Sequence, residues 1–287
     1  MCIRDSIIGN WFQSRNCRDK VILASKVTGR SGMKWFRNKE TRLNKEQITS
    51  ALEGSLRRLK TETIDIYQIH WPDRIVNIFG QQGFEPHKNA ETYNAKIPET
   101  LEALENLRKD GKIRAFGVSN ETPWGMMKFL QVSKEKKLPR MMSIQNVYSL
   151  VNRVFDIHNS EVSIRENCGL LAYSPLAGGR LSGKYVGGKN PKKARYTLWP
   201  RRFSRHHTER GESAIEKYVN LANKHGIAPS TFANAFVNDR PFVTSNIIGA
   251  TTMDQLKENI GSIDIELTEE ILEKINIIHN NNPNPAP

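Results

Sequence analysis

Short apolar segments rich in β-branched residues alternate along the chain with longer segments whose apolar residues recur every three or four positions. Several short segments are apolar at consecutive positions, which is typical of strands covered on both faces of a parallel sheet. The predicted strands are residues 21–27, 64–70, 113–118, 142–147, 170–174 and 245–249. The predicted helices are residues 46–59, 97–110, 126–137, 213–225, 229–237 and 268–275. This alternation predicts an α/β fold with parallel strands joined by helical crossovers.

The type of parallel sheet follows from the turns after the strands. An open nucleotide-binding sheet carries a glycine-rich turn after its first strand, and the chain contains neither G-x-G-x-x-G nor G-x-x-x-x-G-K-[ST]. We therefore expect a (β/α)8 barrel, whose usual size is about 250 residues. Six strands are predicted where a barrel has eight, so either two strands go unrecognised or the chain begins late; we expect the first two strands to be absent. We expect residues 1–6 (MCIRDS) to be an unrelated leader and residues 7–287 to form one N-terminally incomplete barrel domain.

Composition and charge narrow the class of protein. The 287 residues are 38% hydrophobic, and three widely spaced cysteines without C-x-x-C spacing exclude a disulfide scaffold and a zinc ribbon. No apolar run reaches the length of a membrane span, and the N-terminus lacks the apolar core of a secretory signal. These features predict a cytoplasmic protein that does not bind a membrane.

Two long segments follow predicted strands at the end of the sheet where barrel active sites lie, residues 71–96 and residues 177–211. The net charge is +13, and residues 180–210 contain ten Lys or Arg and a single acid, Glu209. A solvated surface loop and a phosphate-binding loop both explain this charge.

Polar side chains stand at the carboxyl ends of the predicted strands. Lys26 and His70 end the first two strands, where each has an ordinary structural explanation, but both belong to the same edge of the sheet. Ser119, Asn120 and Gln145 end the next two strands and could hold a planar carboxamide, or could simply form turns and helix caps. Tyr173 could stack on a flat ring, and the small residues after the last strand would let a phosphate approach backbone N–H groups.

The motifs at these positions resemble the aldo-keto reductases from residue 7 to the C-terminus. They are KV at Lys26, YQIHWPDR at residues 67–74, GVSN at residues 117–120, QN at residues 145–146, AYSPL at residues 172–176 and IIGATTMDQLKENI at residues 247–260. The His70 motif, the long basic loop and the ending NPNPAP are most similar to the bacterial Tas-like NADP(H)-dependent branch.

The resemblance implies chemistry and roles. Members of this family reduce an aldehyde or ketone with hydride from NADPH, using an Asp, Tyr, Lys and His tetrad. Lys26 matches the lysine, His70 the histidine, and Trp71 a wall of the substrate pocket. The implied cofactor contacts are Ser119, Asn120 and Gln145 for the carboxamide, Tyr173 for the nicotinamide ring, Ser174, Leu176 and Gly178 for the pyrophosphate, and Gly249, Thr251, Thr252, Gln255, Glu258 and Asn259 for the adenosine end.

The chain departs from the family pattern at two places. Thr251 and Gln255 stand where many members place a basic residue on the 2′-phosphate, so NAD(H) stays open as the cofactor unless Arg201, Arg202 or Arg205 supplies the charge. The family Asp and Tyr have no counterpart in this chain, which predicts impaired carbonyl reduction.

Two other functions remain as alternatives. A nucleotide-binding regulatory protein, similar to the potassium-channel β subunits of this family, would explain a cofactor ring without its proton donor. Single-strand nucleic-acid binding would use the aromatic and basic residues of the 180–210 segment, but we expect no nucleic-acid partner because the family folds this segment over the pyrophosphate. We expect a small-molecule partner and no metal ion, since His206 and His207 lack a third ligand at useful spacing. The oligomeric state is left open by the sequence.

Overall fold

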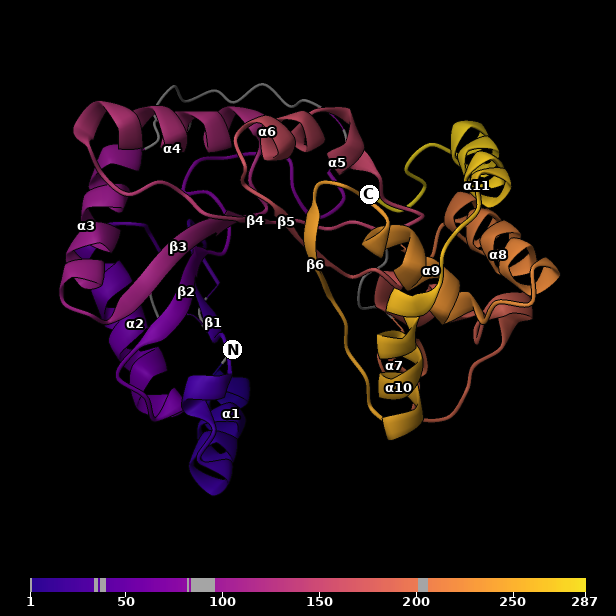
Figure 1. Cartoon of the computed structure of the whole chain (residues 1–287), viewed down its shortest axis with the longest axis horizontal. Helices are drawn as coiled ribbons and strands as arrows, with labels where there is room; N and C mark the ends of the chain where they lie inside the picture. The colour runs from indigo at the N-terminus through magenta and orange to yellow at the C-terminus, as the bar shows by residue number, and fades with distance from the viewer. Residues whose placement is uncertain (1, 34–35, 37–39, 82, 84–95, 201–205) are drawn as a thin grey trace. The chain divides into compact units, whose positions relative to one another are not determined.

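The computed structural model describes residues 2–33, 36, 40–81, 83, 96–200 and 206–287. The chain forms two compact units. The first contains residues 1–76 and 85–145, and the second contains residues 77–84 and 146–287. Figure 1 shows both, with the helices and strands labelled. Each unit is described by itself.

The first unit is built on four parallel strands, β1 (Ala24–Val27), β2 (Ile64–Ile69), β3 (Ile113–Ser119) and β4 (Ile144–Gln145). They pair in chain order, and every pairing is parallel. Helices α2 (Lys45–Leu59), α3 (Ile97–Lys109) and α4 (Pro123–Lys136) connect them, while α1 (Cys2–Arg15) packs on α2. The apolar faces of these helices bury residues such as Leu52, Leu101 and Met126 completely. Burial of apolar surface between helix and sheet therefore holds this unit together.

The second unit contains two further parallel strands, β5 (Leu170–Tyr173) and β6 (Val243–Ile247). Its helices are α5 (Val154–Ile157), α6 (Asn159–Arg165), α7 (Arg195–Leu198), α8 (Glu209–Lys224), α9 (Pro229–Asn238), α10 (Met253–Gly261) and α11 (Glu269–Asn281). Short 3-10 segments are η3 (Ala177–Ser182), η4 (Val186–Gly188) and η6 (Ser262–Asp264). The core gathers aromatic rings, with Tyr148 stacked on Phe236 and edge-on to Phe242.

The α/β class and the parallel pairing are confirmed. The described residues contain six strands, where a closed (β/α)8 barrel has eight. The structure corrects several boundaries. β1 begins at Ala24 and not at Val21, because the Leu23 amide donates to the Asp65 carboxylate. β6 begins and ends two residues before the prediction, because Leu170 pairs with Val243.

The helix corrections have a common cause. Helices α4 and α8 begin before the predicted residues, at side chains that cap them: Thr122 accepts from the Gly125 amide, and Thr208 accepts from the Gly211 amide. The structure also adds α5 and α6, and α7 lies within the long basic segment. Residues 2–6 of the predicted leader are helical and continue directly into the rest of α1.

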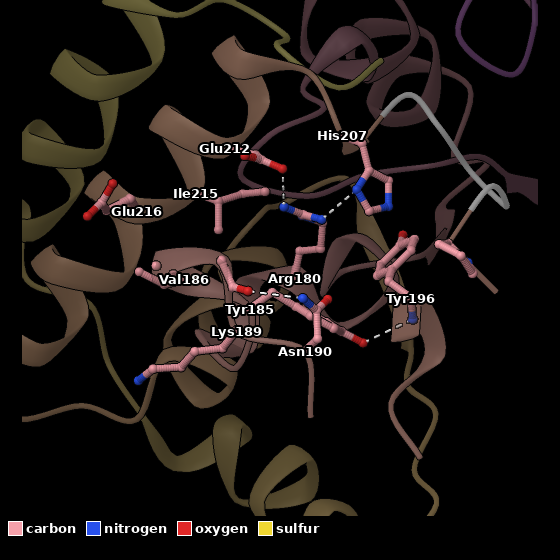
Figure 2. Close-up of a pocket in the computed structure, with 13 residues that line it drawn as sticks. Arg180, Tyr185, Val186, Lys189, Asn190, Tyr196, His207, Glu212, Ile215 and Glu216 are labelled. Atoms are coloured by element: carbon pink, nitrogen blue, oxygen red, sulfur yellow. Dashed lines mark hydrogen bonds and ion pairs between the residues drawn. The ribbon is translucent and has the colours of Figure 1, made fainter. Parts of the chain in front are cut away.

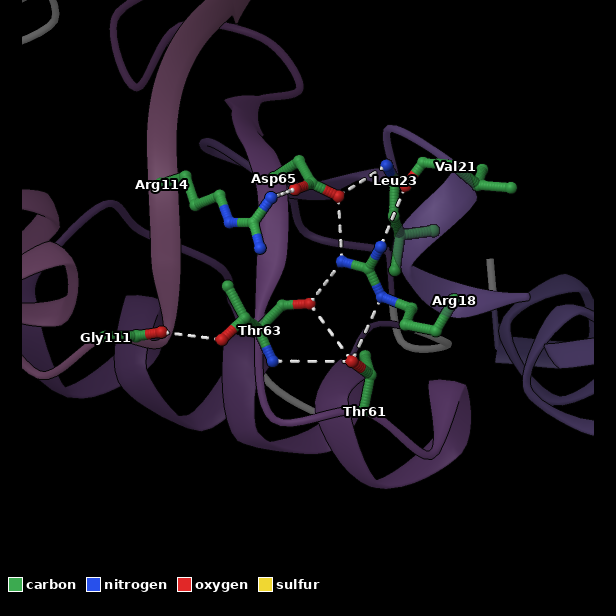
Figure 3. Close-up of polar contacts among 8 residues, drawn as sticks. All are labelled: Arg18, Val21, Leu23, Thr61, Thr63, Asp65, Gly111 and Arg114. Atoms are coloured by element: carbon green, nitrogen blue, oxygen red, sulfur yellow. Dashed lines mark hydrogen bonds and ion pairs between the residues drawn. The ribbon is translucent and has the colours of Figure 1, made fainter. Parts of the chain in front are cut away.

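A polar cluster at the amino ends of β2 and β3 ties three segments of the first unit together (Figure 3). Asp65 accepts hydrogen bonds from Arg18 at 2.8 Å, from the Leu23 amide at 2.8 Å and from Arg114 at 2.6 Å. Burial alone would raise the pKa of Asp65, but the Leu23 amide and the two arginines outweigh it and hold the pKa below its usual range.

We expect Asp65→Asn to destabilise the first unit by about 2 kcal/mol. The asparagine carries no negative charge to pair with the two arginines, and its NH2 group would face one of the N–H groups that now donate to Asp65. Because the folded pKa of Asp65 is depressed, its stabilising effect is present above the usual aspartate pKa and is lost as pH falls through the folded value. Urea unfolding would measure both effects. The control is Asp19→Asn, at an exposed carboxylate nearby. Equal stability of the two variants would contradict the prediction.

Candidate active site

The register of the first two strands places Lys26 and His70 on one face of the sheet. Lys26 pairs with Gln68, and the His70 amide donates to the Val27 carbonyl at 2.8 Å, so β2 continues one residue past its paired end. Alternate residues of a strand share a face, which puts Lys26, Gln68 and His70 together and Tyr67 on the other side. Tyr67 is completely buried. The prediction that these two strand ends meet at one edge is therefore consistent with the register.

The electrostatics of this face favour neutral side chains. Burial, and then the positive charge of Arg4, lowers the pKa of Lys26 from 10.5 to about 8. Burial, followed by the charge of Lys26, lowers the pKa of His70 from 6.5 to about 4. His70 is thus a neutral imidazole near pH 7, able to donate a hydrogen bond to a carbonyl oxygen or accept one. Among the described residues, Lys26 has no carboxylate partner.

Gln68 is a residue of this face that the sequence analysis missed. Its side chain is completely buried, and both polar atoms of its amide lack a hydrogen-bond partner in the described part of the chain. Buried amides are nearly always satisfied, so an orphaned one beside a candidate catalytic lysine fits a site that is completed by a bound molecule. The alternation of the strand, two residues before His70, was the signal that could have found it.

The segment after β2 is tied to the end of β3 by two contacts. The Asn120 side-chain amide donates to the His70 carbonyl at 2.8 Å. Arg74 and Glu121 form a buried ion pair at 2.5 Å, with 8% and 1% of their side chains exposed. A Cβ atom at Gly125 would overlap both Glu121 and Arg74, so only glycine fits below the pair. These contacts fix the backbone that carries His70.

The three predicted carboxamide ligands lie at the ends of β3 and β4, but two already have partners. The Ser119 hydroxyl donates to the Gln145 carbonyl at 2.7 Å, and Asn120 takes the left-handed conformation with its amide bound to His70. The Gln145 side chain is half-buried and has no hydrogen bond to a described residue. Of the three, Gln145 is the side chain whose amide is available to a ligand carboxamide.

Trp71, predicted as a pocket wall, is 8% exposed. Its indole N–H donates to the Arg30 carbonyl at 2.9 Å, and its ring lies 4.4 Å from the ring of His70. A Cβ atom at Gly29 would overlap the Trp71 carbonyl, which shows how closely the segments after β1 and β2 approach. The ring of Trp71 thus supports one side of His70.

In the second unit, the predicted cofactor residues after β5 form a strained turn. Four of the six residues from Ser174 to Gly179 have positive φ: Ser174 at 61°, Ala177 at 48°, Gly178 at 69° and Gly179 at 99°. Leu176 and Ala177 have φ of opposite sign, −94° and 48°, and such a pair creates concave backbone that can bind an anion. Ser174 and Ala177 are strained, because they are non-glycine residues with positive φ. The turn is therefore suited to a phosphate group.

A cation lies against this turn. A Cβ atom at Gly179 would stand 3.2 Å from Lys184 Nζ. Burial, and then the positive charge of Arg195, lowers the pKa of Lys184, which places Arg195 within electrostatic range. The sequence analysis did not single out these two residues. Arg201, Arg202 and Arg205, proposed there as the source of charge, lie outside the described residues.

The predicted adenosine contacts gather at the start of α10. Thr252 caps the helix by accepting from the Gln255 amide, and Gln255 Oε1 accepts from the Thr251 hydroxyl at 3.0 Å. Glu258 accepts from Ser230, and Asn259 is buried, donating to the Gly249 carbonyl at 3.3 Å. Gly249 has open space around its Cα, so this segment leaves its backbone accessible.

No three His, Cys, Asp or Glu side chains in the described ranges stand together as metal ligands would. Among the described helices, none combines the length and apolar character needed to cross a bilayer.

Comparison with known proteins places these residues in a family. Residues 2–280 match the sequence profile of the Aldo/keto reductase family. The chain belongs to the aldo/keto reductase family. It is 44% identical over 287 residues to Protein tas of Escherichia coli K12, covering 99% of this chain and 82% of that protein. It is 35% identical to an aldo-keto reductase of Babesia bovis, over 91% of this chain and 96% of the relative. An uncharacterized oxidoreductase of Bacillus subtilis, YrpG, is 30% identical over 96% of this chain.

Membership in the aldo/keto reductase family supports an oxidoreductase activity on small carbonyl compounds. It also agrees with the position of Lys26 and His70 at the carboxyl ends of parallel strands, the end at which barrel enzymes build their active sites.

Proposed function

We propose that the protein binds a nicotinamide nucleotide, with NADPH preferred, and is built for reduction of an aldehyde or ketone. The observation that carries this proposal is the pairing of Lys26 and His70, two partly buried groups with lowered pKa values on one face at the strand ends. Perturbed groups of this kind gather at functional sites.

Each unit, taken by itself, carries groups that suit a part of the nucleotide. Gln145 offers a free amide to the nicotinamide carboxamide, and Tyr173 is half-buried at the end of β5, where its ring can stack on the nicotinamide. The strained turn at Ser174, Leu176 and Gly178 would take the pyrophosphate, and the start of α10 with Thr251, Thr252 and Gln255 the adenosine end. The nucleotide supplies the hydride when it is bound.

The chain's own residues then act on the carbonyl oxygen. Neutral His70 donates a hydrogen bond to that oxygen and orients the carbonyl. The positive charge of Lys26 stabilises the alkoxide that develops, in a site where burial strengthens the interaction. Tyr148 is not suited to donate the proton, because it is completely buried and burial raises its pKa.

The preference for NADPH follows from the resemblance to the Tas-like branch, since Thr251 and Gln255 are neutral. Lys184 and Arg195 place positive charge beside the strained turn and would strengthen binding of the pyrophosphate, which both nucleotides carry. The second candidate function is a nucleotide-binding regulatory protein, which would hold the nucleotide with the same residues but would not turn it over.

Nucleotide binding to the purified chain tests the proposal. We expect NADPH to bind more tightly than NADH, and Lys184→Met to weaken the binding of both nucleotides by about tenfold, because the pyrophosphate loses a nearby cation. Lys257→Met, at an exposed lysine of α10, is the control. The decay of NADPH absorbance with an aldehyde then separates the two candidates, since binding without turnover favours the regulatory protein. Failure to bind either nucleotide would contradict both.

A further inference from the structure

Arg180, which follows the strained turn, is almost completely buried in the second unit, with 7% of its surface exposed. Its guanidinium donates to Glu212 of α8 at 2.8 Å and contacts His207 Nδ1 at 3.0 Å (Figure 2). The guanidinium carbon lies over two rings, 5.7 Å from the centre of Tyr185 and 5.6 Å from that of Tyr196. A guanidinium within cation–π distance of two rings that also makes a charged hydrogen bond is not equivalent to a lysine ammonium.

The same contacts lead to the turn. The Tyr196 hydroxyl donates to the Ala177 carbonyl at 3.3 Å, and the Tyr196 amide donates to the Tyr185 hydroxyl at 3.2 Å. A Cβ atom at Gly178 would overlap the Tyr196 hydroxyl, so Tyr196 lies directly behind the turn. Arg180 is thus hydrogen-bonded to Glu212 of α8 and lies within cation–π distance of the Tyr196 ring, which supports Ala177 and Gly178.

Packing alone does not hold this region. Arg180, Tyr185, Tyr196, His207 and Glu212 line a cavity of about 500 Å³ (Figure 2). A residue bordering an open cavity lacks the dense contacts that fix side chains in a core. A strained backbone conformation persists only where surrounding contacts hold it in place. Here the hydrogen bonds and ring contacts centred on Arg180 hold the turn.

We infer that Arg180 is the positioning residue of the nucleotide-binding turn, setting nucleotide affinity from behind the turn through Tyr196 and not by touching the ligand. This inference rests on the proposed function, because the turn is taken there as the pyrophosphate site. It assigns to Arg180 a share of binding, with no part in the chemical step.

The test compares Arg180→Met and Arg180→Lys with the unmodified protein in NADPH titrations. Arg180→Met removes the positive charge, the N–H donors and the planar guanidinium beside the two rings. We expect it to weaken NADPH binding by about tenfold or more. Arg180→Lys keeps the charge toward Glu212 but loses the plane, so it should recover only part of the affinity. Arg165→Met, which breaks an exposed ion pair on α6, should leave affinity unchanged.

A second control separates positioning from general destabilisation. Phe155→Leu weakens the aromatic core of this unit at α5, away from the turn, and should lower stability without changing the dissociation constant. Arg180→Met should also leave kcat at saturating NADPH unchanged where turnover is measurable. Equal affinity of Arg180→Met and the unmodified protein would overturn the inference while leaving the proposed function intact.

Hydrogen exchange without nucleotide keeps the inference testable if NADPH does not bind. Amides of residues 174–183 should exchange faster in Arg180→Met than in the unmodified protein, with no change in β5 or α9. Unchanged exchange in that segment would overturn the inference independently of the nucleotide.

Discussion

Replacing Glu121 with alanine is expected to destabilise the first unit by about 3–5 kcal/mol, because the variant leaves the Arg74 guanidinium buried without its carboxylate. The pair is 2.5 Å apart and nearly inaccessible to water. Arg74 would keep one polar contact, the Thr122 hydroxyl at 2.9 Å, and its position over the Trp124 ring. Neither contact replaces a carboxylate, so the free-energy cost of burying the Arg74 cation would no longer be offset.

Urea unfolding of three variants would measure this effect. Glu102→Ala removes an exposed pair with Lys136 in the same unit and should cost no more than about 1 kcal/mol. The double variant Glu121→Met, Arg74→Met should be much closer to the unmodified protein than Glu121→Ala, because it leaves no unpaired charge. If Glu121→Ala unfolds like Glu102→Ala, the pair is not buried in solution and the prediction is wrong.

The second large predicted effect is a gain in the stability of the first unit. Lys26→Met should stabilise the first unit by about 2–3 kcal/mol at pH 7, since the folded chain pays to keep a charged ammonium where its pKa is about 8 instead of 10.5. The sign follows from linkage: the lowered folded pKa means that the penalty is complete below about pH 8 and disappears as pH rises through the unfolded value. Loss of function with a gain of stability is typical of active-site groups.

The comparison is made by urea unfolding of both proteins at pH 7 and pH 10.5. The gain should be largest at the lower pH and nearly absent at the higher one. Lys134→Met, at an exposed lysine of α4, should show no such difference. A Lys26→Met variant less stable than the unmodified protein at pH 7 would mean that the ammonium has a favourable partner, contrary to the structure.

The sequence predicted the parallel α/β architecture and the strand ends that carry candidate chemistry, because both depend on local periodicity. Lys26 and His70 are two such cases, each ending an apolar strand. It did not predict the exact strand boundaries, since β1 and β6 are trimmed or shifted by non-local partners, the Asp65 carboxylate and the neighbouring β5.

Contacts between distant residues account for the rest. Arg180 lay in a basic segment that the sequence explained equally as a solvated loop or a phosphate-binding loop. Its own partners could not be predicted, because His207 and Glu212 stand 27 and 32 positions further along the chain. Gln68 read as one more position of a buried strand, and only the absence of partners in three dimensions distinguishes it. Ser119 and Asn120 matched a ligand motif, but their bonds to the Gln145 and His70 carbonyls required the fold to be known.

The close packing of Gly125 against the Arg74–Glu121 pair couples substitutions at these three positions. Any side chain at position 125 would overlap the Arg74–Glu121 pair, while loss of either charged partner alone would leave the other buried. The three positions are therefore epistatic: a larger residue at position 125 becomes acceptable only after both charges have been removed. Removing the two charges one after the other therefore passes through an intermediate with an unpaired buried charge, whichever charge is removed first.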